Sequence, residues 1–132
     1  MRALFVDDDE SVNFFHGIIV EEYGGFEECE FYDNPMEALD RLAQLEEEES
    51  PNVLFLDINM PPIDGWEFLD ELNERNLHIP VISIVSTSMN PEDKIRAQNH
   101  PLVSHFQSKP LTVEFLGKVK EAYLENHPVI TD

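Results

Sequence analysis

Acidic side chains stand directly after two largely apolar segments of this 132-residue sequence. Three consecutive aspartates (7–9) follow the run 2–6, and Asp57 follows the run 53–56, in which no polar residue occurs. A short run of this kind is typical of a strand that is buried on both faces of a parallel sheet. An aspartate that leaves such a strand could act as a nucleophile, as a metal ligand or as a loop cap.

Hydroxyl and amino groups follow two further predicted strands. Ser86 and Thr87 come after residues 81–85, and Lys109 follows residues 102–107. If all these segments are parallel strands, their carboxyl ends meet at one edge of the sheet, where open α/β sheets bind ligands. We therefore expect polar side chains that are far apart in the sequence to converge on one site.

The expected site has the groups needed for phosphoryl transfer. Carboxylates crowded into one crevice repel each other, by roughly 4 kcal/mol for two charges about 4 Å apart at an intermediate dielectric constant. A divalent cation relieves this repulsion, and oxygen ligands without His or Cys favour Mg²⁺ or Mn²⁺. Lys109 would pair with an incoming phosphate, and Ser86 could donate a hydrogen bond to it. A carboxylate nucleophile, a metal and a lysine suit phosphoryl transfer to an aspartate.

Each of these residues alone also fits an ordinary structural role. Asp9 fits a helix cap better than a metal ligand, and Asp57 by itself could be a loop residue. Ser86 could belong to a polar turn, and Lys109 could be a surface lysine. The phosphoryl-transfer hypothesis therefore depends on the joint placement of these residues, and so on the predicted fold.

The segment 10–23 has the spacing of an amphipathic helix. Its apolar residues Val12, Phe15, Ile19 and Tyr23 recur at helical intervals, and two glycines follow the segment. We expect this stripe of side chains to face the core.

Four more helices are predicted from their start signals. Asn34 and Asn90 each precede a proline, Asp64 stands three residues before a glutamate, and Thr112 precedes the last apolar-periodic segment. The remaining strand, 26–32, is more polar than the others and is expected at or near an edge of the sheet.

Alternating strands and helices predict an α/β fold. It would be a doubly wound (βα)5 three-layer sandwich, with a five-stranded parallel sheet and helices on both faces. If the strand order is 2-1-3-4-5, strands one and three are neighbours at the switch point, and Asp57 faces the acidic pair. We predict a single domain over residues 2–126 and a short tail over 127–132.

Composition limits the classes of partner. There are 28 acidic and 8 basic residues, for a net charge of −20, which disfavours binding to nucleic acids and to anionic membranes. The single cysteine, Cys29, excludes an internal disulfide and a cysteine metal site. No apolar run approaches the roughly 18 residues that span a membrane, and no cleavable signal precedes the first strand. We therefore expect a cytoplasmic protein.

Four motifs resemble the receiver domain of two-component response regulators. They are Val-Asp-Asp-Asp at 6–9, Leu-Asp-Ile-Asn-Met-Pro-Pro-Ile-Asp-Gly at 56–65, Ser-Thr at 86–87 and Lys-Pro at 109–110. The resemblance covers residues 2–126 and implies the CheY-like fold, a five-stranded sheet of order 2-1-3-4-5.

The resemblance implies a role for each acidic residue of the site. Asp57 corresponds to the phosphoacceptor. Asp7 and Asp8 correspond to the acidic pair that holds Mg²⁺, with Asp8 the more direct ligand. Asp57 itself and the backbone carbonyl of Asn59 would complete the protein's share of the coordination.

The resemblance also implies a set of switch residues. Lys109 would contact the phosphoryl group, and the peptide bond before Pro110 would be cis. Ser86 corresponds to the switch hydroxyl, with Thr87 as the alternative, because the preceding segment is one residue longer than in the family. A strand bulge could absorb that extra residue. Phe106 corresponds to the aromatic switch position, where it would act through packing alone.

The sequence therefore predicts a stand-alone response regulator. It would accept a phosphoryl group onto Asp57 from a sensor histidine kinase or a histidine phosphotransfer protein. It would signal to a downstream protein target through a surface that spans roughly residues 88–125. We expect a switch rather than an enzyme, with at most slow self-dephosphorylation.

Two other functions compete with this prediction. One is a receiver-like binding module that works without phosphorylation. The other is a Mg²⁺-dependent phosphohydrolase resembling the haloacid dehalogenase family, which is disfavoured because Asn59 stands where that family has a second aspartate. Phe14, Phe15 and Ile18 or Ile19 could also form a kinase-docking face, but we prefer a core position for these side chains.

Overall fold

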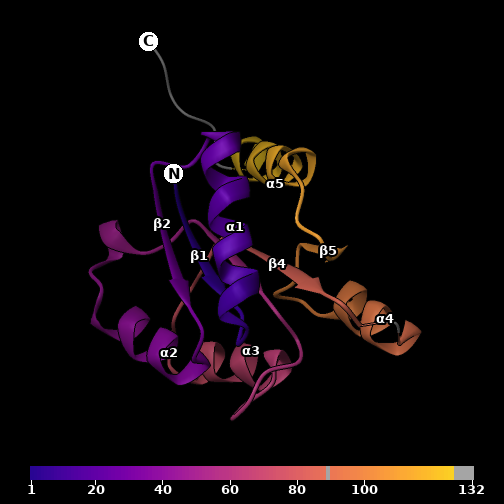
Figure 1. Ribbon diagram of the computed structural model, residues 1–132. Coiled ribbons are helices and arrows are strands. Elements are labelled where there is room, and N and C mark those ends of the chain that lie inside the picture. The colour runs from indigo at the N-terminus through magenta and orange to yellow at the C-terminus, as the bar shows by residue number, and fades with distance from the viewer. Residues whose placement is uncertain (89, 127–132) are drawn as a thin grey trace.

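The described residues form one parallel sheet of five strands in the order β2-β1-β3-β4-β5. The computed structural model describes residues 1–88 and 90–126. Its elements are β1 (Arg2–Val6), α1 (Glu10–Tyr23), β2 (Glu28–Tyr32), α2 (Pro35–Gln44), a 3-10 turn (Glu47–Glu49), β3 (Val53–Leu56), α3 (Gly65–Glu74), β4 (Val81–Ser86), α4 (Pro91–Asn99), β5 (His105–Ser108) and α5 (Val113–Asn126). The predicted doubly wound fold and strand order are confirmed (Figure 1).

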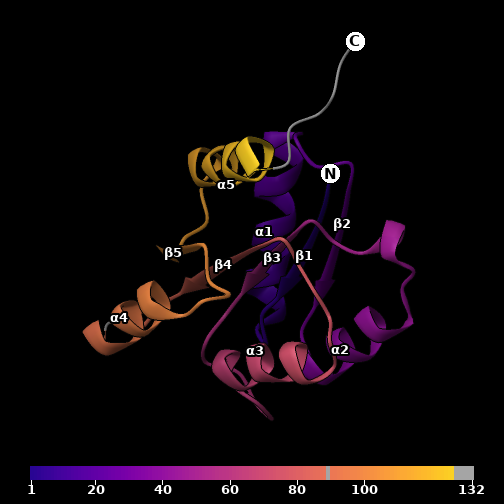
Figure 2. The ribbon, with the colours of Figure 1, turned by 180° about the vertical axis from the view of Figure 1, so that it is seen from behind.

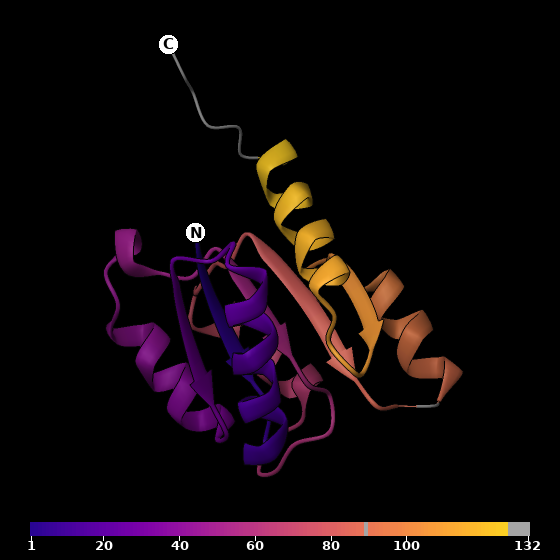
Figure 3. The same cartoon turned by 45° about the horizontal axis from the view of Figure 1, so that its top comes forward.

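Helices cover both faces of the sheet. Helices α1 and α5 lie on one face, and α2, α3 and α4 lie on the other (Figures 1, 2 and 3). Each face has its own apolar cluster, because alternate residues of each strand point to opposite sides. Phe5 and Phe55, for example, stack on the α1–α5 side with ring centroids 4.5 Å apart.

Strand β3 is the centre of the sheet, as its sequence predicts. It pairs in parallel with β1 through Leu4↔Leu54 and with β4 through Leu54↔Ile82, and all four of its residues are buried. Burying one such side chain contributes about 1.5–3 kcal/mol to folding. The position of the residue that follows β3 is therefore fixed by a fully buried strand.

Predicted start signals occupy the expected caps. The side chains of Asn34, Asp64 and Asn90 accept hydrogen bonds from backbone amides in the first turns of α2, α3 and α4. Asp9 caps α1 by accepting from the amides of Ser11 and Val12, and the hydrogen bond from the Ser11 hydroxyl, together with these amide bonds, lowers the pKa of its carboxyl. The cap interpretation of Asp9 is confirmed.

Strand β5 starts later than predicted. It begins at His105 rather than at residue 102, because the preceding residues form a turn. In that turn the Leu102 amide donates to His100 Nδ1 at 3.1 Å, and the Val103 amide donates to the His100 carbonyl at 3.2 Å. Strand β2 likewise begins at Glu28 rather than at residue 26, on an edge of the sheet as predicted.

Strand β4 has no bulge across its described pairs, although the sequence allowed for one. Residues 81–84 pair in order with residues 53–56 of β3, and residues 83–86 pair in order with residues 105–108 of β5. Neither register skips a residue. The strand has six residues and ends at Ser86.

The predicted inward stripe of α1 is only partly confirmed, because Ile19 and Tyr23 pack against the core on the α1–α5 side but Phe15 does not. The buried residues of α1 are Asn13, His16 and Val20, whereas Phe15 is exposed and Phe14 is 74% exposed. Apolar residues occur on both sides of this helix, so periodicity alone does not decide which side faces the sheet.

No helix of the described residues is both long enough and apolar enough to cross a membrane.

Candidate functional site

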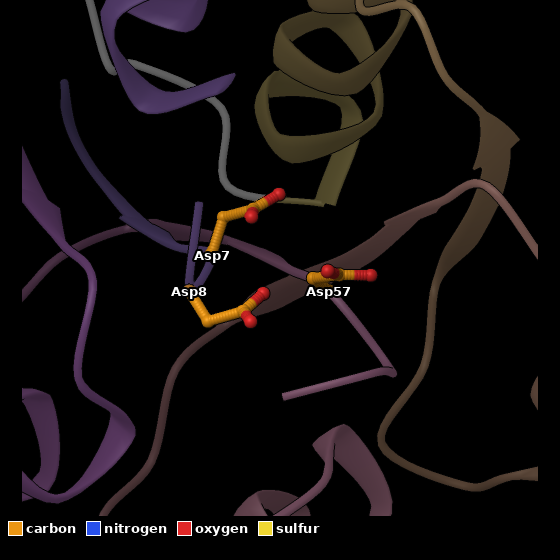
Figure 4. Close-up of side chains that lie close together, drawn as sticks. All are labelled: Asp7, Asp8 and Asp57. Atoms are coloured by element: carbon orange, nitrogen blue, oxygen red, sulfur yellow. The ribbon is translucent and has the colours of Figure 1, made fainter. Parts of the chain in front are cut away.

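Three carboxylates converge where β1 and β3 end. Asp7 and Asp8 follow β1 and Asp57 follows β3, and one carboxylate oxygen from each lies within 4.8 Å of the others (Figure 4). Asp7 and Asp57 are buried, and Asp8 is exposed. The structure thus brings together the three acidic residues that the sequence predicted to share one crevice.

Backbone hydrogen bonds hold two of these residues in register with the sheet. The Asp57 amide donates to the Val6 carbonyl at 3.0 Å, and the Asp7 amide donates to the Tyr32 carbonyl at 3.0 Å. Each aspartate thus extends a ladder of strand pairing by one residue. Strands β1 and β3 are neighbours, so the two side chains leave the sheet side by side.

Lys109 places its ammonium between two of the carboxylates. Its Nζ lies 2.5 Å from Asp7 Oδ2 and 3.4 Å from Asp57 Oδ2. Burial alone would lower the pKa of Lys109, but the hydrogen bond to Asp7 and the charge of Asp57 outweigh it and raise that pKa. The predicted cis peptide bond between Lys109 and Pro110 is confirmed.

Asp57 is 6% exposed, and its carboxyl has one oxygen without a partner. Oδ2 accepts from Lys109, but the buried Oδ1 has no hydrogen-bond partner among the described residues. Burial raises the pKa of Asp57, the Lys109 charge opposes this rise and the Asp7 charge reinforces it. An unpartnered carboxylate oxygen beside further carboxylates suits a hard cation such as Mg²⁺.

The two hydroxyl residues at the end of β4 differ in exposure. Ser86 is fully buried, and its Oγ accepts from the Ser88 amide at 3.1 Å, whereas Thr87 is exposed. The Lys109 amide donates to the Ser86 carbonyl at 3.0 Å, which ties the end of β4 to the loop that carries the lysine. Phe106 is half-buried against the core on the α2–α4 side.

A known family matches nearly the whole described chain. The model of the family described as "Response regulator receiver domain" matches residues 3–119. The chain belongs to this family. The sheet order, the acidic site and the family model therefore agree on a receiver domain.

Individual relatives support the assignment at moderate identity. The receiver is 26% identical over 125 residues to the probable C4-dicarboxylate response regulator DctR of Halalkalibacterium halodurans, covering 95% of this chain and 52% of the relative. It is 36% identical over 86 residues to a protein-glutamate methylesterase/protein-glutamine glutaminase of Treponema denticola, covering 65% and 22%. This chain therefore spans about half, or less, of the length of these relatives.

Solved structures of receivers share this fold. A two component response regulator from Cytophaga hutchinsonii superposes with a TM-score of 0.85 at 29% identity, covering 94% of this chain and 96% of that one. A CheY-like receiver domain protein from Methanospirillum hungatei superposes with a TM-score of 0.77 at 24% identity, covering 96% and 95%.

Sequence reasoning missed the local role of Gly65 in this receiver. The Gly65 amide donates to the Ile58 carbonyl at 2.7 Å, so the start of α3 lies against the loop that follows Asp57. A Cβ on Gly65 would lie 2.6 Å from the Asp57 carbonyl oxygen, and only glycine fits this contact. The Asp-Gly pair was noted as part of a family motif, but no local pattern signals a close approach to residue 57.

Sequence reasoning also missed Asn13, which contacts the site from α1. Its Nδ2 donates to the carbonyls of Asp7 at 2.9 Å and Tyr32 at 3.2 Å. The available signal was a polar residue flanked by apolar ones in the predicted helix, but the predicted stripe did not include it. Asn59, a predicted backbone ligand, lies exposed in the loop after β3, and its metal-binding role stays a prediction.

Proposed function

We propose that this receiver accepts a phosphoryl group onto Asp57 from a phosphohistidine of a sensor histidine kinase or a histidine phosphotransfer protein. The observation that carries the proposal is the meeting of Asp7, Asp8 and Asp57 with the Lys109 ammonium at the end of two neighbouring strands. A carboxylate nucleophile, a cation for the phosphoryl oxygens and further carboxylates for a metal are the groups that this transfer needs.

In the proposed transfer an oxygen of Asp57 attacks the phosphorus of the donor. The new P–O bond forms as the P–N bond to the imidazole breaks, and the leaving imidazole nitrogen keeps the electron pair and takes a proton from solvent. Lys109 moves from the carboxylates to the incoming phosphoryl oxygens, and its raised pKa keeps it charged. Mg²⁺, or Mn²⁺, held by Asp7, Asp8, Asp57 and the Asn59 carbonyl would offset the negative charge of the phosphoryl group.

The signal is proposed to leave through α4, β5 and α5. Ser86, with Thr87 as the alternative, would donate its hydroxyl to the phosphoryl group, and Phe106 would repack behind it. Ser86 and Phe106 lie on adjacent strands two positions apart in register, because Ile84 pairs with Phe106 and Ser86 pairs with Ser108. Phosphorylation would shift the population between two packings of this face, to which a downstream protein binds.

The phosphodonor is proposed to dock on α1. Phe14, Phe15 and Ile18 are exposed, which favours the docking interpretation over the core position that we preferred from sequence. Phe14 and Ile18 line a groove with Phe31 of β2, and the same groove reaches Ser11, near the site. Histidine kinases draw their phosphoryl group from ATP, so we propose that the exchange takes place in the cytoplasm. We also propose that the phosphorylated protein slowly dephosphorylates itself.

Intact mass measurement tests the proposal directly. We expect the wild-type protein, incubated with acetyl phosphate and Mg²⁺, to gain the mass of one phosphoryl group. Asp57→Asn should gain none and keep the fold, as judged by circular dichroism. The matched control is Asp33→Asn, an exposed aspartate in the loop after β2, which should be labelled like the wild type. Equal labelling of Asp57→Asn would refute the proposal, and an unlabelled wild type would favour a phosphorylation-independent binding module.

A further inference from the structure

The inner face of α1 is polar where a core helix is normally apolar. Asn13 is 9% exposed and His16 is 3% exposed, and both are buried on the side of α1 that also buries Val20. Burying a polar side chain costs about 1–3 kcal/mol unless hydrogen bonds compensate for the lost water. Sites where local sequence rules fail in this way are often functional ones.

Asn13 joins three segments of the chain. From α1, its Nδ2 donates to the Asp7 carbonyl after β1 at 2.9 Å and to the Tyr32 carbonyl at the end of β2 at 3.2 Å. Both neighbours are acceptors, so the amide group must present its donors to them. The Tyr32 carbonyl also accepts from the Asp7 amide at 3.0 Å, so Asn13 and Asp7 share one anchor on β2.

The bond to the Asp7 carbonyl constrains Asp8. A peptide unit is planar, so a fixed carbonyl oxygen on residue 7 also fixes the amide and the Cα of residue 8. The Asp7 carboxylate is held separately, because its Oδ1 accepts from the Asp9 amide at 3.0 Å and its Oδ2 from Lys109 at 2.5 Å. Asp8 has no comparable side-chain bond among the described residues, and it is exposed.

We propose that Asn13 is a positioning residue for the acidic pair. By holding the Asp7–Asp8 peptide unit against the end of β2, it directs the Asp8 carboxylate toward Asp57 and so sets the affinity of the site for Mg²⁺. This role rests on the proposed function, because it requires that the three carboxylates bind the metal. The contact acts through the backbone and does not involve the metal itself.

Calorimetric titration with Mg²⁺ separates positioning from folding. We expect Asn13→Ala to weaken Mg²⁺ binding by about 10-fold or more, the effect typical of lost outer-shell hydrogen bonds. The matched control is Val20→Ala, which removes a buried side chain from the same face of the same helix. Val20→Ala should lower the urea midpoint of unfolding and leave the Kd for Mg²⁺ within about 2-fold, within the typical scatter for a distant site.

A second variant guards against loss of the fold. Asn13→Ser retains one hydroxyl donor, so it should fold and bind Mg²⁺ with a Kd between those of the wild type and Asn13→Ala. Unchanged Mg²⁺ affinity in folded Asn13→Ser and Asn13→Ala, beside a wild type that binds Mg²⁺, would overturn the positioning role alone. A wild-type protein without Mg²⁺ affinity would overturn the metal site of the proposed function and the positioning role together.

Discussion

The strand ends that carry the aspartates and the helix α4 near β5 are held in different ways. Asp7 and Asp57 are buried, and their amides continue the pairing of β1 with β2 and of β3 with β1. Helix α4 buries Ala97 against the core, while Ile95 is 56% exposed. The sheet therefore holds the two aspartates in place, whereas α4 buries few of its own side chains.

Side-chain contacts rather than a deep apolar face fasten α4. The Arg96 guanidinium lies over the Trp66 ring of α3 at 4.6 Å, and His100 stacks on that ring at 6.0 Å between centroids. A cation–π contact of this kind contributes about 0.5–1 kcal/mol at an exposed site. The comparison predicts that substitutions at the site cost much more stability than comparable substitutions on α4.

Removal of the Lys109 charge should have the largest effect. Lys109→Met leaves the buried carboxylates of Asp7 and Asp57 without their cation, and we expect the metal-free protein to lose about 3 kcal/mol of unfolding free energy. Lys94→Met removes an exposed lysine of α4 and should change that energy by less than about 0.5 kcal/mol. Urea denaturation measures both unfolding free energies. Equal losses of unfolding free energy in the two variants would contradict the difference between the site and α4.

Acidification should destabilise the site region through His16. Burial lowers the pKa of His16 to about 4, opposed by the charge of Asp7. The unfolded chain, with an ordinary histidine pKa of about 6.5, then binds more protons, so stability falls as the pH drops from 6.5 toward 4, by at most about 3 kcal/mol from this group.

The His16 contribution is measurable by urea denaturation at a series of pH values. His16→Leu should flatten the fall in unfolding free energy between pH 6.5 and pH 4, because leucine does not titrate. His78→Leu, at an exposed position, should retain the wild-type slope. An unchanged slope in His16→Leu would mean that folding does not lower the pKa of His16.

A single methyl group at Gly65 should disturb the loop after β3. Its Cβ would lie 2.6 Å from the Asp57 carbonyl oxygen and 2.9 Å from the Ile58 Cα, so Gly65→Ala should cost about 2 kcal/mol and slow phosphorylation by acetyl phosphate. Gly117→Ala in α5 is the matched control, since its Cβ would meet only a Tyr23 ring atom at 4.0 Å. That variant should gain up to about 1 kcal/mol from helix propensity, and a neutral Gly65→Ala would contradict the close contact.

The smallest effect is expected on α4. Arg96→Ala removes the cation from the Trp66 ring and should cost about 0.5–1 kcal/mol. It should also shift the fluorescence of Trp66, the one tryptophan in the sequence, without changing Mg²⁺ affinity. Lys118→Ala on the exposed side of α5 serves as the control. A loss of several kcal/mol in Arg96→Ala would mean that α4 is as firmly held as the strand ends.

Local patterns predicted most elements because their causes are local. The apolar run of β3 and the caps at Asn34, Asp64 and Asn90 depend on neighbouring residues, and the structure has them where the sequence placed them. The start of β5 was misjudged because a turn closed by the His100 side chain replaces its first predicted residues.

By itself the sequence determined the order of strands and helices and the polar residues that follow each strand. Asp57 and Lys109 come together because carboxyl ends of parallel strands share one edge of a sheet. Tertiary structure alone decided that Asn13 faces inward, that Gly65 touches the Asp57 backbone and that Ser86 rather than Thr87 is buried. These features depend on segments that are distant in sequence but packed together, and no local pattern contains that information.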